Sequence, residues 1–486
     1  MPNIRLPENE THWLDVRNWV EPEPEPGYQH APAQAMEAFK DIKYGVRIHW
    51  GLYSLRHWQG ESWPFLKIGF AERQEYQQIY QQFNPAGFDA DDWMAFFQRV
   101  GLKCFAITTK HHEGFSLWDT QARVRRRVNY AAPGGPQIEE CDLAYSVMET
   151  PFRRDILEEL CDAARKYGIK IDFYFSHPDW YDADFRPYAF HPLQTPRVRE
   201  RPEEYGNKRY HRQLATRLLA AAPDRTPEET ERMLQRHRQQ LSELLTHYGK
   251  IDMLCLDMWL GADVWPELRQ TVRLLRQLQP EVMLRGRGIG NYGDYYTPEG
   301  FVPGDPANTD MPWMVIYPLA RSFSYDPQGV FYKGWRWIVR NIVDCAAKGG
   351  SFMVGIGPDE NGRFHPQAVR DLEGAGDWLR VNGEAIYATC PRPVWKEGDR
   401  VRFTCSKDGQ KIYAILLGWP GRHLRLRSMQ AAENLQVTLL GDDQLLRWQA
   451  DRQGIVIELP DELQKPKNRP CEYAYAFRII GAPGSL

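Results

Sequence analysis

The chain has 486 residues, enough for a large domain and a smaller companion, because single domains usually hold about 100–250 residues. Lys and Arg number 61 against 64 Asp and Glu, so the formal net charge is −3 and no overall field attracts nucleic acid or an anionic membrane. No stretch has the roughly 18 apolar residues of a membrane span, and residues 1–20 lack the pattern of a secretory signal. We therefore expect a cytoplasmic protein that binds neither nucleic acid nor membrane.

The N-terminal residues 1–34 are predicted to form a leader outside the folded domains. Their EPEPEP repeat at 21–26 cannot lie inside a helix, because proline lacks an amide hydrogen and fixes φ. We expect this segment to be extended and exposed.

From residue 35 to residue 389, short apolar segments typical of strands alternate with longer amphipathic segments typical of helices. The predicted strands are 44–52, 104–112, 170–180, 251–259, 281–289 and 351–359. The predicted helices are 89–100, 152–167, 226–248, 264–279, 334–348 and 366–380. This alternation predicts an α/β domain with a parallel sheet, and an eight-stranded (β/α)8-like barrel of the TIM type, regular or irregular, fits it best.

A doubly wound open sheet is the alternative fold for this domain. The chain has no G-x-G-x-x-G turn after its first strand and no Walker loop, so nothing supports a nucleotide site in such a sheet. The barrel is therefore favoured.

The pattern changes after residue 389. Residues 390–486 contain short segments of alternating apolar and polar residues, separated by turn residues such as Asp408-Gly409 and Gly441-Asp442. We expect them to form an antiparallel β-sandwich.

The eight cysteines are scattered along the chain, and none belongs to a C-x-x-C pair. Several lie in apolar strand or helix patterns, so we expect buried, free thiols. They are Cys104, Cys141, Cys161, Cys255, Cys345, Cys390, Cys405 and Cys471.

Polar side chains stand at the carboxyl ends of five predicted strands, where barrels of this kind carry their active sites. In chain order they are His49, then His111 and His112, then Tyr174 and Trp180, then Asp257, then Arg287. Each has a structural explanation too, as a core histidine, a packing tyrosine or a salt bridge. Adjacent strand residues face opposite ways, however, so at most one of the two neighbouring histidines would simply cap the core.

Asp257 is the most informative of these residues. It follows the apolar run MLCL and precedes Met258-Trp259, so its carboxylate is expected in a dry, aromatic place where a charge is costly without a partner or a function. An ion pair with Arg287 and a catalytic role both remain open. A nucleophilic carboxylate needs a second carboxyl group as acid and base. The downstream candidates are Asp294, Glu299, Asp305 and Asp310.

Several of these segments resemble the α-L-fucosidases of glycoside hydrolase family 29. The similar segments are FKDIKYGVRIHWGLYS (39–54), FNPAGFDADDWMAFFQRVGLKCFAITTKHHEGFSLWDT (83–120), RRDILEELCDAARKYGIKIDFYFSHPDW (153–180), IDMLCLDMW (251–259), DCAAKGGSFMVGIGPDENGRF (344–364) and WLRVNGEAIYAT (378–389). The resemblance implies a retaining exo-glycosidase with a barrel and a C-terminal β-sandwich, acting on fucosylated oligosaccharides or glycosides by double displacement. A closely similar sugar such as α-L-galactose is the other substrate it suggests, and it implies neither a cofactor nor a metal.

The same likeness gives roles to individual residues. It implies that Asp257 is the nucleophile and that Glu299, in TPEG, is the acid/base residue. The residues expected to contact the sugar are His49, Trp63, His111, His112, Tyr174, Arg287 and Trp313. The chain departs from the usual family motifs at Ser62, Cys255, Arg285, Gly286 and Gly355, which bears on which sugar is accepted.

Two other functions remain open at this point. A metal-dependent hydrolase would use His49, His111, His112 and Asp257 as ligands, although the first strand lacks an H-x-H pair. A catalytically idle sugar-binding relative would account for the altered motifs. The sequence does not indicate an oligomeric state.

Overall fold

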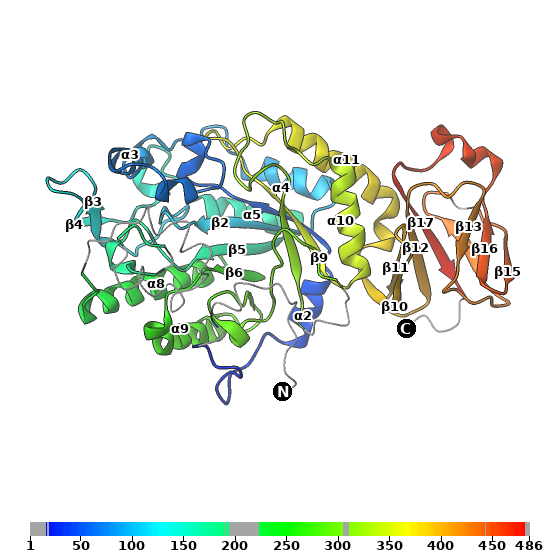
Figure 1. Cartoon of the computed structure of the whole chain (residues 1–486), viewed down its shortest axis with the longest axis horizontal. Coiled ribbons are helices and arrows are strands. Elements are labelled where there is room, and N and C mark those ends of the chain that lie inside the picture. The colour runs from blue at the N-terminus through cyan, green and yellow to red at the C-terminus, as the bar shows by residue number, and fades with distance from the viewer. Residues whose placement is uncertain are drawn as a thin grey trace.

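The structure, a computed structural model, describes residues 16, 19–188, 190–193, 223–304, 311–442 and 444–481. Figure 1 shows a large domain of helices and strands joined to a smaller domain of strands at the C-terminal end. Among the described residues, no helix combines the length and the apolar character needed to cross a bilayer.

The large domain is built on a parallel sheet in the order β7-β6-β5-β2-β1-β9-β8. Its strands are β1 (Tyr44–Ile48), β2 (Cys104–Lys110), β5 (Lys170–Ser176), β6 (Met253–Asp257), β7 (Met283–Leu284), β8 (Met314–Pro318) and β9 (Ser351–Ile356). Every residue of β1, β2, β6 and β9 is buried, as expected of parallel strands that are covered on both faces.

The two edge strands of this sheet are joined by the segment 295–299. Parallel bridges pair Tyr295 with Arg285, just after β7, and pair Glu299 with Ile316 of β8. The segment therefore takes the place of a further strand and turns the curled sheet into an irregular barrel. The predicted (β/α)8-like fold is confirmed in this irregular form.

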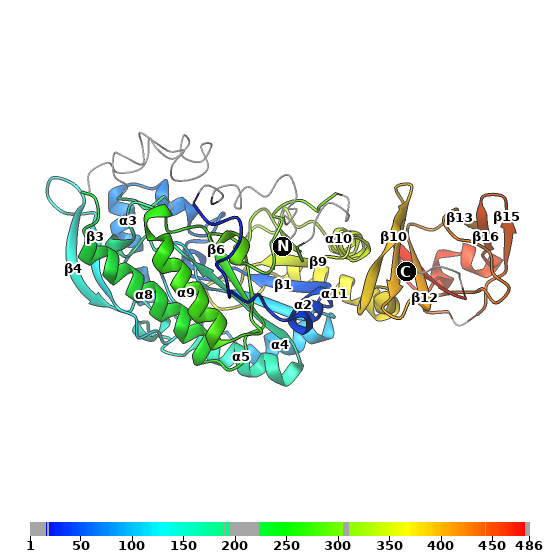
Figure 2. The same cartoon turned by 90° about the horizontal axis from the view of Figure 1, so that it is seen from below.

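Helices follow the strands as the sequence pattern predicts. The predicted ones are α4 (Ala90–Arg99), α5 (Ile156–Tyr167), α8 (Pro227–Thr246), α9 (Trp265–Leu278), α10 (Trp335–Ala347) and α11 (Pro366–Asn382), preceded in the chain by the short helices α2 (Ala33–Lys40) and α3 (Phe70–Tyr76). Figure 2 shows α8 and α9 along the outside of the sheet. Their ends are set by local chemistry: Thr226 and Glu229 form a capping box at the start of α8, and Gly168 ends α5 at a φ of 66°.

One hairpin was not predicted. Strands β3 (Val124–Asn129) and β4 (Gln137–Leu143) pair antiparallel between β2 and α5, and they project at the end of the barrel farthest from the second domain (Figures 1 and 2). Their residues are mostly exposed or half-buried. Charged strands such as these lack the apolar alternation by which strands are recognised in a sequence.

The second domain contains two antiparallel sheets, ordered β10-β11-β12-β17-β14 and β13-β16-β15. The strands are β10 (Thr389–Glu397), β11 (Val401–Ser406), β12 (Lys411–Leu417), β13 (His423–Leu426), β14 (Gln436–Leu439), β15 (Trp448–Asp451), β16 (Gly454–Glu458) and β17 (Ala474–Ile480). Buried side chains from both sheets, among them Phe403, Ile457 and Phe477, form one apolar cluster. The predicted β-sandwich is confirmed.

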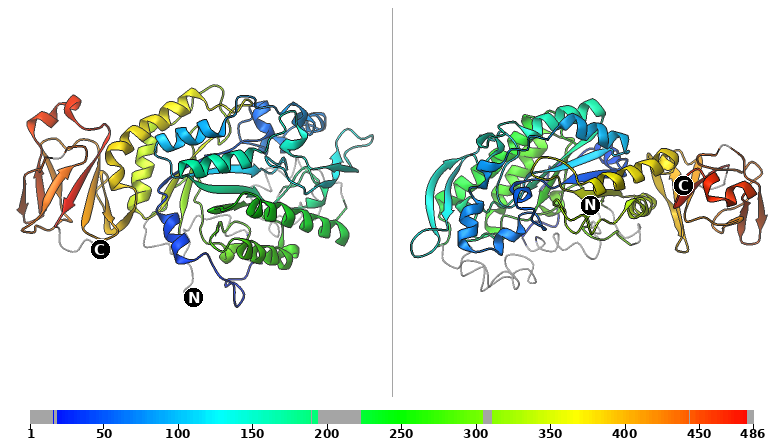
Figure 3. Two further views of the ribbon diagram at one scale, coloured as in Figure 1. Left: turned by 180° about the vertical axis from the view of Figure 1, so that it is seen from behind. Right: turned by 90° about the horizontal axis from the view of Figure 1, so that it is seen from above.

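Helices α10 and α11 lie between the barrel sheet and the second domain (Figures 1 and 3). Arg402 Nε of β11 donates to Asp344 Oδ1 of α10 at 2.6 Å, and Trp378 Nε1 of α11 donates to the carbonyl oxygen of Ala474 at 2.8 Å. The two domains are therefore connected by specific polar contacts.

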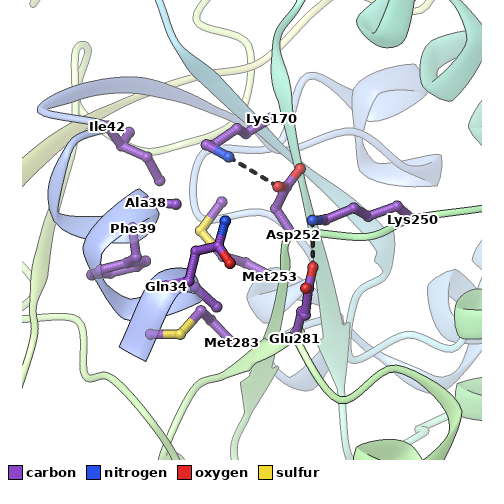
Figure 4. Close-up of a pocket in the computed structure, with 11 residues that line it drawn as sticks. Gln34, Ala38, Phe39, Ile42, Lys170, Lys250, Asp252, Met253, Glu281 and Met283 are labelled. Carbon is purple, nitrogen blue, oxygen red and sulfur yellow. Dashed lines mark hydrogen bonds and ion pairs between the residues drawn. The ribbon is translucent and has the colours of Figure 1, made fainter. Parts of the chain in front are cut away.

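A pocket of about 260 Å³ lies beside α2, where β5, β6 and β7 begin (Figure 4). Its charged groups pair with one another, because Lys170 Nζ is 3.1 Å from Asp252 Oδ1 and Lys250 Nζ is 2.6 Å from Glu281 Oε2. Barrels of this type carry their chemistry at the opposite, carboxyl ends of the strands. This pocket is therefore not the candidate active site.

The leader contacts the barrel. Trp265 Nε1 of α9 donates to Glu21 Oε2 at 2.7 Å, and Tyr28 Oη donates to the carbonyl oxygen of Tyr292 at 2.6 Å. Within the 21–26 repeat, Pro22, Glu23 and Pro26 are exposed as predicted, whereas Glu21 is half-buried because its side chain finds partners on the barrel. Residues 1–15 lie outside the described part of the chain.

Asp294 connects the leader to the barrel. Its side chain is fully buried and accepts hydrogen bonds from Arg276 Nη2 (2.5 Å), the amide of Leu284 (2.8 Å) and the amide of Ala31 (2.9 Å). Asp294 is therefore a structural anchor rather than the catalytic acid for which it was a candidate.

We predict that Asp294→Ala lowers the free energy of unfolding by about 3–5 kcal/mol, because it leaves the buried Arg276 without its carboxylate. Chemical denaturation measures the change. The control is Glu281→Ala, which breaks the exposed ion pair with Lys250 and should cost less than about 1 kcal/mol. Equal losses in the two variants would contradict the structural role of Asp294.

Candidate active site

Asp257, the last residue of β6, lies at the carboxyl end of the barrel. Tyr174 Oη of β5 donates to its Oδ2 atom at 2.6 Å, and Arg287 Nη1 donates to its Oδ1 atom at 2.7 Å. Arg285 Nη1 lies 3.5 Å from the same Oδ1 atom. The carboxylate is only 7 % exposed, and these donors compensate its charge and fix its orientation.

The same arginine also binds the second carboxyl group. Arg287 Nη2 donates to Glu299 Oε2 at 2.8 Å, and the Glu299 side chain is 42 % exposed against 10 % for that of Asp257. One guanidinium thus spans a buried and an exposed carboxylate, close enough for both to reach one bound molecule. Retaining glycosidases place their two carboxyl groups about 5–5.5 Å apart. Of the other candidates, Asp305 and Asp310 lie outside the described residues.

Three aromatic rings line the site next to Asp257. His49 follows β1, and its ring centroid lies 5.9 Å from that of His111 and 5.8 Å from that of Tyr174. The His111 and Tyr174 rings stack at 5.7 Å. Residues from three neighbouring strands therefore meet at one rim, as their positions at the strand ends predict.

The two adjacent histidines each bond a serine. His111 Nδ1 lies 2.5 Å from Ser62 Oγ, and His112 Nδ1 lies 2.6 Å from Ser176 Oγ. These bonds fix both rings and leave Nε2 of each histidine on the far side of its ring. Ser62, one of the positions at which the chain departs from the motif it resembles, therefore orients His111.

The electrostatics keep His49 neutral and Tyr174 protonated. Burial, reinforced by His111 and Arg47, lowers the pKa of His49 well below its ordinary value. Burial and the neighbouring Asp257 raise the pKa of Tyr174 well above its ordinary value. In the described part of the chain the buried His49 Nδ1 atom has no hydrogen-bond partner, so the neutral ring keeps one hydrogen-bonding nitrogen unused.

Of the two tryptophans predicted to contact the sugar, the structure brings one to the site. Trp63 begins the short helix η2 (Trp63–Leu66), is half-buried, and packs edge-on against His112 at 5.0 Å. Trp313 precedes β8, at the opposite end of the barrel, where a Cβ on Gly350 would come within 2.3 Å of its ring. The placement of Trp313 at the sugar site is therefore wrong, because it fills the amino end of the barrel.

Glu61 belongs to the site although the sequence did not single it out. It is buried, and its Oε1 atom accepts the amide hydrogens of Phe323 (2.9 Å) and Ser324 (3.1 Å). Burial raises its pKa, Glu299 raises it slightly further, and His111 opposes the rise. Its position next to the Ser62-Trp63 motif was the signal that could have identified it.

Phe323 is a second missed residue. Its ring stacks on His49 with 4.6 Å between centroids. A Cβ on Gly355 would lie 2.2 Å from this ring, so the glycine at that position makes room for the phenylalanine. At the departure at Gly286 two backbone segments approach closely, because a Cβ on the facing Gly293 would lie 2.4 Å from the Gly286 Cα atom.

The remaining departures form a charged cluster inside the barrel. Arg47 Nη2 and Arg285 Nη1 donate to Cys255 Sγ at 2.9 and 3.1 Å, and Arg47 Nη2 lies 3.8 Å from Asp172 Oδ2. All four side chains are buried. Because Arg285 also approaches Asp257, the cluster extends to the carboxylate of the candidate nucleophile.

The alternative of a metal-dependent hydrolase gains no support from this geometry. Among the described residues, no group of three or more His, Cys, Asp or Glu side chains is placed to hold a metal ion. His111 and His112 bond serines instead, and Asp257 bonds Tyr174 and Arg287.

Comparison with known proteins relates both domains to one family. The family model described as Alpha-L-fucosidase matches residues 21–384, and the model of the Alpha-L-fucosidase C-terminal domain matches residues 396–480. Among curated proteins, the tissue alpha-L-fucosidase of Bos taurus is 27 % identical over 471 residues, covering 91 % of this chain and 88 % of the relative.

Solved structures share the fold over almost the whole chain. Alpha-L-fucosidase isoenzyme 1 from Paenibacillus thiaminolyticus is 25 % identical with a TM-score of 0.72, and the match covers 93 % of this chain and 99 % of that one. A GH29 alpha-L-fucosidase from Bacteroides thetaiotaomicron, trapped as a covalent intermediate with 2-fluoro-fucosyl fluoride, is 22 % identical with a TM-score of 0.70, covering 94 % and 100 % of the two chains.

The buried Asp172 predicts a specific dependence of stability on pH. Burial raises its pKa to about 6, although Arg47 and Arg285 oppose the rise. The folded protein therefore holds this proton more tightly than the unfolded chain, and ionising Asp172 destabilises the fold as pH rises from about 4 to about 6.

We predict that Asp172→Asn gains about 2–3 kcal/mol relative to the unsubstituted protein between pH 4 and pH 7, because the variant has no proton to lose. Denaturation curves at several pH values measure the difference. A difference in stability that does not change with pH would show that Asp172 does not titrate in this window.

Proposed function

Because the chain belongs to the alpha-L-fucosidase family, we propose that it is a retaining exo-glycosidase that removes terminal α-L-fucosyl residues from glycans or glycosides. The observation that carries this function is the pair of carboxyl groups, Asp257 and Glu299, on the two nitrogens of Arg287. The covalent intermediate trapped in the Bacteroides relative is the kind of species that double displacement requires.

In the first step, Asp257 attacks the anomeric carbon while Glu299 donates a proton to the departing glycosidic oxygen. Tyr174 and Arg287 hold one oxygen each of the Asp257 carboxylate, so its orientation is set before the sugar arrives. In the second step, Glu299 takes a proton from water, the water oxygen attacks the same carbon, and Asp257 leaves. Two displacements retain the configuration.

The ion pairs of Arg287 with the two carboxyl groups must change differently during this cycle. Its ion pair with Asp257 is buried and suits a group that stays ionised. Its ion pair with the exposed Glu299 suits the resting enzyme, but Glu299 must carry a proton to act as an acid. We infer that a bound sugar weakens the Arg287–Glu299 contact and that Glu299 then takes up its proton.

The rim around Asp257 suits the recognition of a sugar. His49, His111, His112 and Tyr174 offer ring nitrogens and a hydroxyl within one small region, and Trp63 adds an aromatic edge beside His112. Imidazole nitrogens and a phenol hydroxyl can donate hydrogen bonds to the hydroxyl groups of a sugar or accept them. An idle sugar-binding protein would use the same rim but would need neither carboxyl group in its present place.

An α-L-galactoside is the second substrate to compare with the fucoside. It differs from an α-L-fucoside by one hydroxyl group, and Cys255 and Arg285, two of the departures from the family motifs, form a polar contact next to Asp257. The type of reaction and the identity of the sugar are therefore two separate parts of this proposal.

We predict that Asp257→Gly reduces kcat on an aryl α-L-fucoside by at least about 1,000-fold, because the first displacement has lost its nucleophile. Added azide should occupy the space left by the side chain, attack the anomeric carbon and restore product formation. The product should be a fucosyl azide of inverted configuration, since only one displacement occurs. NMR of the product measures the configuration.

The matched variant for this experiment is Glu299→Gly. Here Asp257 still forms the glycosyl-enzyme, and azide replaces the water of the second step, so the fucosyl azide keeps the α configuration. Unchanged turnover in Asp257→Gly, or the same azide product from both variants, would contradict the assignment of the two carboxyl groups.

We predict that His49→Gln lowers kcat/KM by about 10–100-fold through lost hydrogen bonding to the sugar. Because burial lowers the pKa of His49 well below its ordinary value and keeps the ring neutral in the working range, the acidic limb of the kcat/KM profile should keep its midpoint in the variant. The control is His247→Gln, at the exposed end of α8, which should change kcat/KM by less than about twofold. A shifted midpoint in His49→Gln would show that His49 gains its proton in the working range.

A further inference from the structure

Two cysteines face each other where the second domain joins the barrel. Cys390 of β10 and Cys405 of β11 are directly opposite in the antiparallel register, and their Sγ atoms are 3.1 Å apart. Directly opposed residues of antiparallel strands have Cα atoms about 4.5–5.5 Å apart, within the range of about 4.4–6.8 Å that disulfides span. The two strands therefore already hold these residues at the separation that a disulfide needs.

The two sulfur atoms differ in access. Cys405 is buried and Cys390 is half-buried, so an external reagent reaches Cys390 first. Burial and the adjacent Cys390 thiol raise the pKa of Cys405 to about 12, although Arg392 and Lys43 oppose the rise. Cys405 thus remains a protonated thiol near neutral pH and attacks only after a base has taken its proton, so it can act second, as the resolving thiol.

We propose that Cys390 and Cys405 form a reversible disulfide with small disulfides such as glutathione disulfide, and that this bond acts as a redox-dependent clasp at the domain junction. The Cys390 thiolate attacks glutathione disulfide, forms a mixed disulfide and releases one glutathione thiolate. The released thiolate takes the Cys405 proton, and Cys405 then attacks Cys390 Sγ and expels the second glutathione. Two protein thiols are oxidised to one disulfide, and one glutathione disulfide is reduced to two glutathione molecules.

The position of the pair determines what the bond does. Next to Cys390, Pro391 packs on Gly349, where an added Cβ would lie 3.1 Å from the proline ring, and Gly349 precedes strand β9 of the barrel. On the other strand, Arg402 bonds Asp344 of α10. A link between β10 and β11 therefore ties together the strands that connect the second domain to the barrel, and it restricts the unfolded chain between residues 390 and 405.

The clasp lies away from the proposed catalytic groups. Gly349 stands at the amino end of β9, whereas Asp257 ends β6 at the opposite end of the barrel. The disulfide should therefore raise the stability of the folded chain and leave turnover unchanged.

The test uses the full chain, purified in the reduced form and incubated with either reduced glutathione or glutathione disulfide. Remaining thiols are then alkylated, and the digested protein is analysed by mass spectrometry. We expect glutathione disulfide to yield the Cys390 and Cys405 peptides joined and lighter by two hydrogen atoms, and a reductant should separate them. The control residue is Cys141, which is half-buried with its Sγ directed to the Val124 carbonyl oxygen, and which should stay alkylated.

Two outcomes of this experiment would overturn the proposal. Either both cysteines remain alkylated, or Cys390 accumulates as the glutathione mixed disulfide while Cys405 stays free. Cys390→Ser should abolish the joined peptide and leave Cys405 available to the alkylating reagent.

A second measurement tests the clasp itself. The oxidised chain should melt at least about 3 °C above the reduced chain, and Cys390→Ser should show no such gain under the same conditions. The value of kcat/KM on an aryl α-L-fucoside should agree within about twofold between the two redox forms. A joined peptide without a higher melting temperature would contradict a stabilising clasp.

Discussion

The guanidinium group of Arg287 is the contact on which the candidate site depends. It holds both carboxyl groups, one buried and one exposed, and three parts of the chain must meet to form this contact. Strand β6 supplies Asp257, the turn after β7 supplies Arg287, and the segment alongside β8 supplies Glu299. The parallel arrangement brings these ends together at one rim, and the buried polar residues behind it keep the arginines in place.

Much of this arrangement was predictable from the sequence, because strand-end positions are a geometric property of parallel sheets. Asp257, His49, His111 and Tyr174 were predicted to meet for that reason, and they do. The pairing of Asp257 with Arg287 was one of two open readings, and the structure shows that the ion pair and a catalytic role are compatible. Glu299 was one of four downstream carboxyl candidates and was selected among them by the resemblance, and its bond to the same arginine gives that choice independent support.

The incorrect or missing predictions have physical causes as well. Trp313 was assigned to the sugar site by the family resemblance, but a side chain just before β8 belongs to the amino end of the barrel. Phe323 lies in a loop without strand or helix periodicity, so only the room beside Gly355 reveals it. The hairpin β3-β4 is too polar for strand recognition, and the leader binds through contacts with residues more than 240 positions away, which no local pattern can show.

The segment 295–299 joins the barrel by single bridges rather than by a continuous ladder, whereas the strand that ends at Asp257 pairs with β5 over its whole length, from Met253 to Asp257. The segment that carries the proposed acid/base residue should therefore tolerate sequence changes better than the strand that carries the proposed nucleophile. Insertions or substitutions around Glu299 can remodel the side of the pocket that meets the leaving group while the nucleophile keeps its frame. Related enzymes could therefore acquire new acceptors or linkages through changes in this weakly paired segment, while the fold of the barrel stays the same.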